Sequence, residues 1–129
     1  MKITDGTPLT DVGGDSQGWD RVRIEVDNVV ASSTEPFEQD TIANVRDLLA
    51  ICGVETPVPT NVGKGYWNTI CLSWTQFEIE VLEDRFEVYH FHDQHSDIWY
   101  EEHRPGNAFT PRFLTELAGL TDLLNPSQK

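Results

Sequence analysis

The first regular pattern of apolar and polar positions lies in residues 19–27. Val22, Ile24 and Val26 alternate there with charged side chains. A period of two is typical of a strand with one buried face, so this segment predicts a first strand. Residues 1–18 contain four glycines and no apolar period, and they predict a flexible N-terminal arm.

A helical period follows the predicted strand. Apolar residues recur at steps of three and four from Ile42 to Cys52, which is typical of a helix with one buried face. Residues 32–34 offer candidate N-caps, Pro36 suits a first turn, and Gly53 suits a C-terminal stop. The exposed side of this helix is expected to carry Glu38, Asp40, Asn44 and Asp47.

The rest of the chain predicts a loop, a group of strands and a second helix. Proline and glycine mark residues 57–65 as the loop. Thr110-Pro111 begins the second helix, and Asn125-Pro126 ends it. Four segments have the residue composition of strands and are separated by short polar turns: 69–74, 76–82, 85–92 and 97–103. The prediction is an α+β fold, in which residues 19–129 form a single domain with an antiparallel β-meander of about four strands and two amphipathic helices.

The hairpin around Glu83-Asp84 has a predictable register. Its two apolar sets share one face only if the loop has two or four residues. That register pairs Ile79 with Val88 on the buried face and sets Glu80 opposite Glu87 on the other face. It also sets Glu78 opposite Tyr89. Like charges directly across two strands destabilise the pair by up to about 1 kcal/mol.

The turn that follows permits two registers, with a loop over residues 93–96 or over residues 93–97. The five-residue loop places Ile98 and Tyr100 on the buried side. It then places Trp99 and Glu101 beside the acidic residues of the hairpin. Both registers remain open, and both keep Tyr89 and Phe91 on the face that carries Glu78 and Glu80.

The negative charge of the chain is concentrated in this hairpin system. The chain has 22 acidic and nine basic residues, a formal charge of −13 over 129 residues. Residues 76–102 hold nine acidic residues and one arginine, a net charge of −8. Such charge on an open sheet face is compatible with solubility alone. It also suits a protein-binding face made of these residues: Glu78, Glu80, Glu87, Tyr89, Phe91, Trp99 and Glu101.

All four histidines lie in residues 90–103, which raises the alternative of a metal site. His90 and His92 point to the same side of a strand, and Asp97 follows in the next turn. This spacing could chelate Zn²⁺, although hydrogen-bonded structural imidazoles would give the same pattern.

Composition narrows the classes of function. Sparse Lys and Arg exclude direct binding to nucleic acid and to anionic membranes. Residues 1–18 lack the apolar centre of a signal peptide, and Cys52 and Cys71 are too few for a disulfide framework. We therefore expect a cytoplasmic protein. No catalytic constellation is evident, so a non-enzymatic protein without a required cofactor is predicted.

Residues 72–101 (LSWTQFEIEVLEDRFEVYHFHDQHSDIWYE) are similar in style to small acidic bacterial and phage proteins in which a Trp-ended strand leads into an alternating acidic hairpin. Acidic single domains of this size also resemble inhibitor proteins of the immunity, antitoxin, anti-restriction and anti-CRISPR type. The resemblance implies an inhibitor that covers the surface of a basic nuclease or nucleic-acid-binding protein. The alternatives are a metal-binding enzyme or sensor centred on His90, His92 and Asp97, and a structural or assembly protein that acts as a homodimer.

Overall fold

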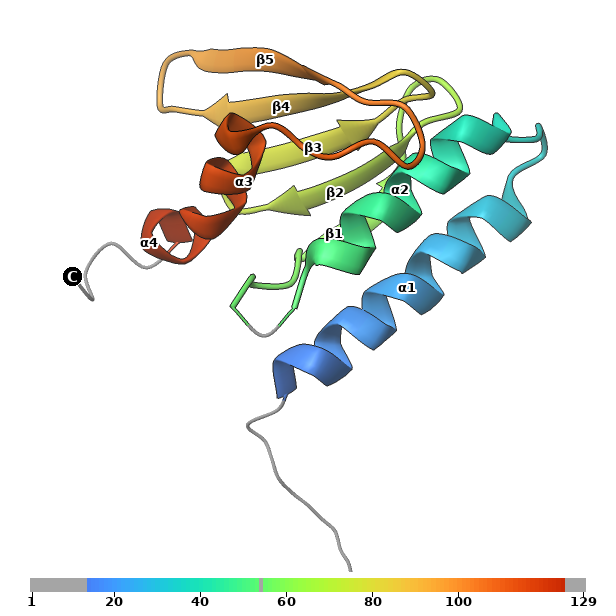
Figure 1. Cartoon of the computed structure of the whole chain (residues 1–129), viewed down its shortest axis with the longest axis horizontal. Helices are drawn as coiled ribbons and strands as arrows, with labels where there is room; N and C mark the ends of the chain where they lie inside the picture. Colours follow the sequence, from blue (N-terminus) through green and yellow to red (C-terminus); the bar gives the residue numbers. More distant parts are fainter. Residues whose placement is uncertain (1–13, 54, 125–129) are drawn as a thin grey trace, which may run out of the picture.

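The computed structural model describes residues 14–53 and 55–124 and shows an α+β fold (Figure 1). Among the described residues all strand pairs are antiparallel, and the strand order β1-β2-β3-β4-β5 is that of a meander, as predicted, but with five strands instead of four. The elements in chain order are α1 (Gly14–Ser32), α2 (Gln39–Ile51), β1 (Asn61–Lys64), β2 (Ile70–Trp74), β3 (Phe77–Val81), β4 (Arg85–Phe91), β5 (Ser96–Glu102), α3 (Pro111–Ala118) and α4 (Leu120–Leu124).

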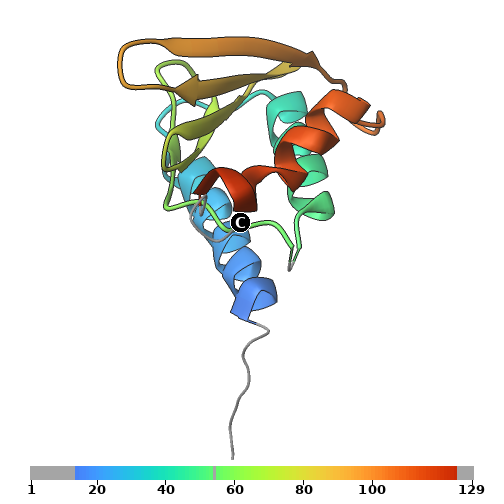
Figure 2. The ribbon, with the colours of Figure 1, turned by 90° about the vertical axis from the view of Figure 1, so that its left-hand side faces the viewer.

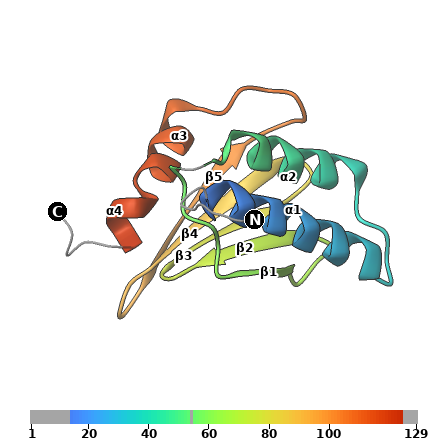
Figure 3. The same ribbon diagram turned by 90° about the horizontal axis from the view of Figure 1, so that it is seen from below.

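The described helices lie on one face of the sheet (Figures 2 and 3). The central strands β2 and β3 alternate strictly between buried and half-buried residues, so one face of each enters the core. Two tryptophans of this core use their indole N–H groups to hold the segment before β1. Trp19 Nε1 donates to the carbonyl of Thr56, and Trp74 Nε1 donates to that of Pro57, each at 2.8 Å.

The predicted strand over residues 19–27 is wrong, because this segment belongs to helix α1. Trp19, Val22 and Val26 are buried at helical steps of three and four, whereas Ile24 is 61% exposed. The alternation of Val22, Ile24 and Val26 is therefore incidental, and the longer series that begins at Trp19 sets the buried face. Helix α1 also contains residues 14–18 of the predicted arm, and residues 1–13 lie outside the described residues.

The predicted loop over residues 57–65 contains strand β1, which pairs with β2 from Asn61↔Ser73 to Lys64↔Ile70. Four residues with only one branched apolar side chain, Val62, give too little pattern to reveal an edge strand. In contrast, the four predicted strands in residues 69–103 are confirmed as β2 to β5.

The predicted register of the β3–β4 hairpin is confirmed. Ile79 pairs with Val88, and Glu80 lies opposite Glu87. The next hairpin adopts neither of the two expected registers. Phe91 pairs with Ser96, and the N–H of His92 donates to the carbonyl of His95, so the loop has only two residues. Asp93-Gln94 contains no glycine and so lacks the usual signature of such a tight turn.

Helix α2 is confirmed, but its N-cap and part of its exposed side differ from the prediction. Its N-cap is Glu38, not a residue of the Ser-Ser-Thr segment, and the Glu38 side chain makes no capping hydrogen bond. Asn44 is fully buried, and its amide donates to the carbonyls of Leu82, Glu83 and His103 at 3.0–3.3 Å. The sequence pattern could not reveal the burial of Asn44, because it does not show which polar residue of a helix faces backbone carbonyls of another element.

Asp47 and His103 join α2 to the end of β5. His103 Nε2 lies 2.9 Å from Asp47 Oδ2, and the His103 ring stacks on Phe109 at 4.3 Å. The same Asp47 oxygen accepts the N–H of Gly106 at 2.8 Å. Burial opposes ionisation of Asp47, but these two hydrogen bonds outweigh it and hold the pKa of the carboxyl below its ordinary value.

The second predicted helix is present as two helices. Thr110 caps α3 as expected, because its hydroxyl accepts the N–H of Phe113 at 3.2 Å. Gly119 ends α3 and α4 starts directly after it. Phe113, Leu117 and Leu120 enter the core, and the expected stop at residues 125–126 lies outside the described residues.

Among the helices that the structure describes, none combines the length and the apolar character that crossing a bilayer requires.

The position of α1 predicts unequal effects of two similar substitutions. Val22→Ala removes fully buried methyl groups and should lower the free energy of unfolding by about 2 kcal/mol. Ile24→Ala changes an exposed site and should alter it by less than about 0.5 kcal/mol. Urea unfolding of both variants measures the difference, and equal losses would contradict the helical burial pattern.

The low pKa of Asp47 predicts a pH-dependent contribution to stability. A carboxyl with a depressed folded-state pKa stabilises the fold above its unfolded pKa of about 3.9, and this stabilisation is lost as the pH falls through the folded value. Asp47→Asn should therefore lower the free energy of unfolding by about 1–2 kcal/mol at neutral pH. The deficit should shrink below about pH 4. A deficit that stays constant in acid would refute the role of the ionised carboxylate.

Candidate functional site

The face of the sheet opposite the described helices carries carboxylates among apolar side chains. We call this surface the acidic face. It is formed by residues of β3, β4 and β5 that alternate with the core-facing positions of the same strands. Its members are Glu78, Glu80, Glu87, Tyr89, Phe91, Ile98, Tyr100 and Glu102.

Hydrogen bonds from neighbouring residues fix three of these carboxylates. Ser73 Oγ donates to Glu78 Oε1 at 3.1 Å, and Thr69 Oγ1 donates to Glu80 Oε2 at 2.5 Å. Tyr89 OH donates to Glu87 Oε1 at 2.8 Å. Each carboxylate therefore has its own donor, which limits the destabilisation that the Glu80–Glu87 pair would otherwise cause.

Arg85 is the cation of this surface among the described residues. Its guanidinium approaches Glu87 Oε2 at 2.9 Å and Asp84 Oδ1 at 2.9 Å, and it lies 5.7 Å from the centre of the Tyr100 ring. One arginine leaves an excess of negative charge against the four carboxylates of the acidic face. The face therefore keeps the negative potential that its sequence predicts.

The apolar part of the acidic face is open to solvent. Tyr100 is 61% exposed, Ile98 50% and Phe91 40%. The rings of Tyr89 and Phe91 stack with their centres 6.0 Å apart. Exposed aromatic and branched side chains rimmed by charge are the usual composition of a protein-binding surface.

Trp99 and Glu101 do not belong to this face, so their assignment to it is wrong. The two-residue turn pairs Trp99 with Val88 and Glu101 with Phe86, and both pairs lie on the core side. Trp99 packs under the guanidinium of Arg112 at 3.9 Å. Glu101 is 2% exposed and accepts hydrogen bonds from the backbone N–H and the hydroxyl of Thr110, at 2.8 and 2.6 Å.

The same turn explains why three members of the acidic face are absent from the predicted set. It places Ile98 and Tyr100 on the acidic face, where the five-residue loop would have buried them, and it sets Glu102 beside Arg85. The other five predicted members, Glu78, Glu80, Glu87, Tyr89 and Phe91, do lie on one face. The four-residue loop over residues 93–96 has the same parity as the observed turn and also places Ile98 and Tyr100 on this face, whereas the five-residue loop does not.

The β1–β2 loop adds two further exposed aromatic rings. Tyr66 is 86% and Trp67 69% exposed, and their rings meet edge to face at 4.8 Å. Trp67 is therefore a surface residue and not part of the core. Gly65 brings this loop against the acidic face, because a Cβ at this position would lie 2.1 Å from Thr69 Oγ1 and 2.7 Å from Glu80 Oε2. Only glycine allows that approach.

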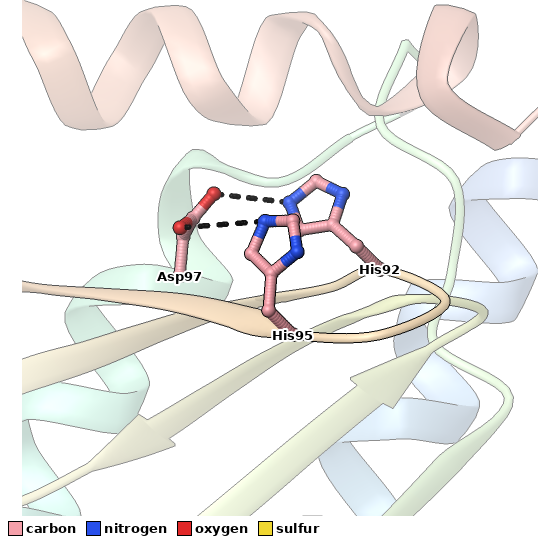
Figure 4. A group of neighbouring side chains, drawn as sticks. All are labelled: His92, His95 and Asp97. Carbon is pink, nitrogen blue, oxygen red and sulfur yellow. Dashed lines mark hydrogen bonds and ion pairs between the residues drawn. The ribbon is translucent and has the colours of Figure 1, made fainter.

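A separate group of potential metal ligands lies at the β4–β5 turn. His92, His95 and Asp97 each offer one ligand atom, and these atoms lie within 4.8 Å of one another (Figure 4). Of the predicted set His90, His92 and Asp97, the structure thus brings two together and adds His95. His90 instead points to α3, where its Nε2 lies 2.5 Å from Glu116 Oε1.

The carboxylates of the acidic face affect the ionisation of two neighbours. Burial, followed by the charges of Glu80 and Glu78, raises the pKa of the Cys71 thiol to about 12. Burial, the hydrogen bond to Glu87 and the nearby carboxylates also raise the pKa of the Tyr89 hydroxyl. Both groups therefore stay neutral at physiological pH, and neither is an activated thiolate or phenolate.

No family model matches the chain, and neither a curated protein nor a solved structure matches it. The geometry and electrostatics of the acidic face and of the histidine group are therefore the basis for the functional assignment.

The negative field around Cys71 predicts slow alkylation of its thiol. Raising a thiol pKa to about 12 lowers the thiolate fraction at pH 8 by about 1,000-fold relative to an ordinary thiol. A thiolate of higher pKa is also more nucleophilic, which raises the reaction rate by about 30-fold and leaves a net decrease of about 30-fold. In a Cys52→Ser background, iodoacetamide should modify Cys71 at least about 30-fold more slowly in the folded than in the unfolded chain.

Neutralising the carboxylates should reverse part of this effect. The double substitution Glu78→Gln with Glu80→Gln should speed the modification of Cys71, because it removes two charges that disfavour the thiolate. Asp20→Asn with Glu55→Gln changes two exposed acidic residues outside the sheet and serves as the control. Equal rates in the two double variants would show that burial alone protects the thiol.

Proposed function

We propose that the protein is a non-enzymatic binding protein that inhibits a basic partner, a nuclease or another nucleic-acid-binding protein, by covering its surface with the acidic face. The observation that carries this proposal is the placement of four carboxylates and four apolar or aromatic side chains on the one sheet face that no described helix covers.

The charge of the acidic face favours a basic partner over a second copy of the same chain. Two such faces would bring carboxylates against carboxylates, and like charges placed against each other across an interface cost several kcal/mol. A surface that binds phosphates offers Lys and Arg instead. Glu78, Glu80 and Glu87 would then take the place of phosphate groups, and their field would speed the encounter.

The apolar side chains supply binding free energy that the charges alone do not provide. Exposed ion pairs contribute little free energy, and binding needs anchors that become desolvated. Tyr100, Ile98 and Phe91 are the most exposed apolar residues of the face, and they lie next to the carboxylates on β4 and β5. We expect Tyr100 to be the principal anchor, because a tyrosine ring buries a large area and keeps a polar hydroxyl.

The proposal predicts salt-sensitive capture of a basic partner that depends on the acidic face. The immobilised chain should retain a basic protein from a lysate of its source at about 50 mM salt and release it as salt shortens the screening length. Changing Glu78, Glu80 and Glu87 to Gln should abolish retention. Tyr100→Ala should weaken binding at least about tenfold, in the range of a hot-spot residue. The captured protein, once purified, should lose its nucleic-acid binding or cleavage when the chain is added.

Matched variants separate the acidic face from total charge and total hydrophobicity. Asp20→Asn, Asp27→Asn and Glu55→Gln together remove the same number of charges from exposed positions outside the sheet. Ile24→Ala removes a side chain as exposed as Tyr100, but on α1. These controls should bind like the original chain. Capture that withstands high salt, or that the face and control variants reduce equally, would refute the proposal.

A further inference from the structure

The β4–β5 turn gathers three metal-ligating side chains of mixed type. His92 Nε2 lies 3.0 Å from Asp97 Oδ2, and His95 Nε2 lies 4.0 Å from Asp97 Oδ1. The two imidazole rings stack with their centres 4.4 Å apart. Figure 4 shows both rings directed toward the same carboxylate, on the side of the hairpin where α3 lies.

We propose that His92, His95 and Asp97 bind one borderline divalent transition-metal ion such as Zn²⁺. Two imidazole nitrogens and one carboxylate oxygen form a donor set that this class of ion prefers. The site is distinct from the acidic face, because it lies at the turn and on the core side of the hairpin. The proposal of this metal site therefore does not rest on the proposed function.

The distances suit such an ion after small side-chain movements. Zn²⁺ binds imidazole nitrogen and carboxylate oxygen at about 2.0–2.2 Å, which places tetrahedral ligand atoms about 3.4 Å apart. The three ligand atoms already lie within 4.8 Å of one another. Exposed side chains change rotamer on a picosecond to nanosecond timescale, so packing does not oppose the remaining approach of at most about 1.4 Å.

The backbone holds the ligands together before the ion arrives. The hydrogen bond from His92 N–H to the His95 carbonyl, 2.8 Å long, closes the turn and sets the two histidines opposite each other. Asp97 follows two residues after His95 on β5. All three side chains are exposed, so solvent can reach the ion, and water or a ligand from another molecule would complete its coordination.

Calorimetric titration of the chain with Zn²⁺, without a histidine tag and after chelator treatment and dialysis, tests the site. We expect saturable binding of one equivalent at micromolar concentrations, weakening as the pH falls because protons compete for the imidazoles. His95→Gln, His92→Gln and Asp97→Asn should each weaken binding at least about tenfold, since even outer-shell substitutions cost about 10–100-fold. His90→Gln is the matched control and should bind Zn²⁺ like the original chain.

Two further measurements exclude misfolding as the explanation. Thermal unfolding in chelator should leave His95→Gln unchanged, because this side chain is 65% exposed. In the unsubstituted chain, NMR spectra of the imidazole nitrogens should show Zn²⁺-induced shifts for His92 and His95 but not for His90 or His103. Absence of saturable binding, or equal weakening by His90→Gln and His95→Gln, would overturn the proposal. Neither result depends on whether the acidic face binds a partner.

Discussion

The two-residue turn at Asp93-Gln94 determines which residues of β5 lie on each face of the sheet. Side chains alternate along a strand, so a loop that is one residue longer would exchange the two faces of β5. With the observed turn, Trp99 and Glu101 enter the core, and Ile98 and Tyr100 join the acidic face. The same turn brings His92 and His95 together. The composition of the acidic face and the histidine group thus share one geometric cause.

Buried polar groups fix the helices to the end of the sheet where Glu101 lies. The Glu101 carboxylate binds Thr110, the residue that caps α3, so one acidic side chain positions the first turn of a helix. Asn44 and Asp47 bind α2 to the neighbouring backbone and to His103. Because a buried polar group without a partner is costly, these contacts select a single arrangement of α2 and α3 on the sheet. These contacts hold α2 and α3 against the side of the sheet opposite the acidic face.

The sequence predicted the sheet better than it predicted the helices around it. Alternation in β3 and β4 determined the register that sets Glu80 against Glu87, because β3 buries one face over its whole length and β4 buries the matching face at Phe86 and Val88. The helix at residues 14–32 escaped prediction because Val22, Ile24 and Val26 fit a strand over a short window. The role of Glu101 escaped it because its partner, Thr110, lies beyond the end of β5 and no local pattern connects the two.

The hydrogen bonds that hold Glu78, Glu80 and Glu87 have a consequence for the thermodynamics of binding. A flexible side chain loses about 0.5–1.5 kcal/mol of conformational entropy when an interface immobilises it. These three carboxylates are already restrained by Ser73, Thr69 and Tyr89, so folding has removed much of that freedom before any partner arrives. A partner would meet a preorganised set of charges, and the entropy lost on docking would come mainly from its own lysine and arginine side chains.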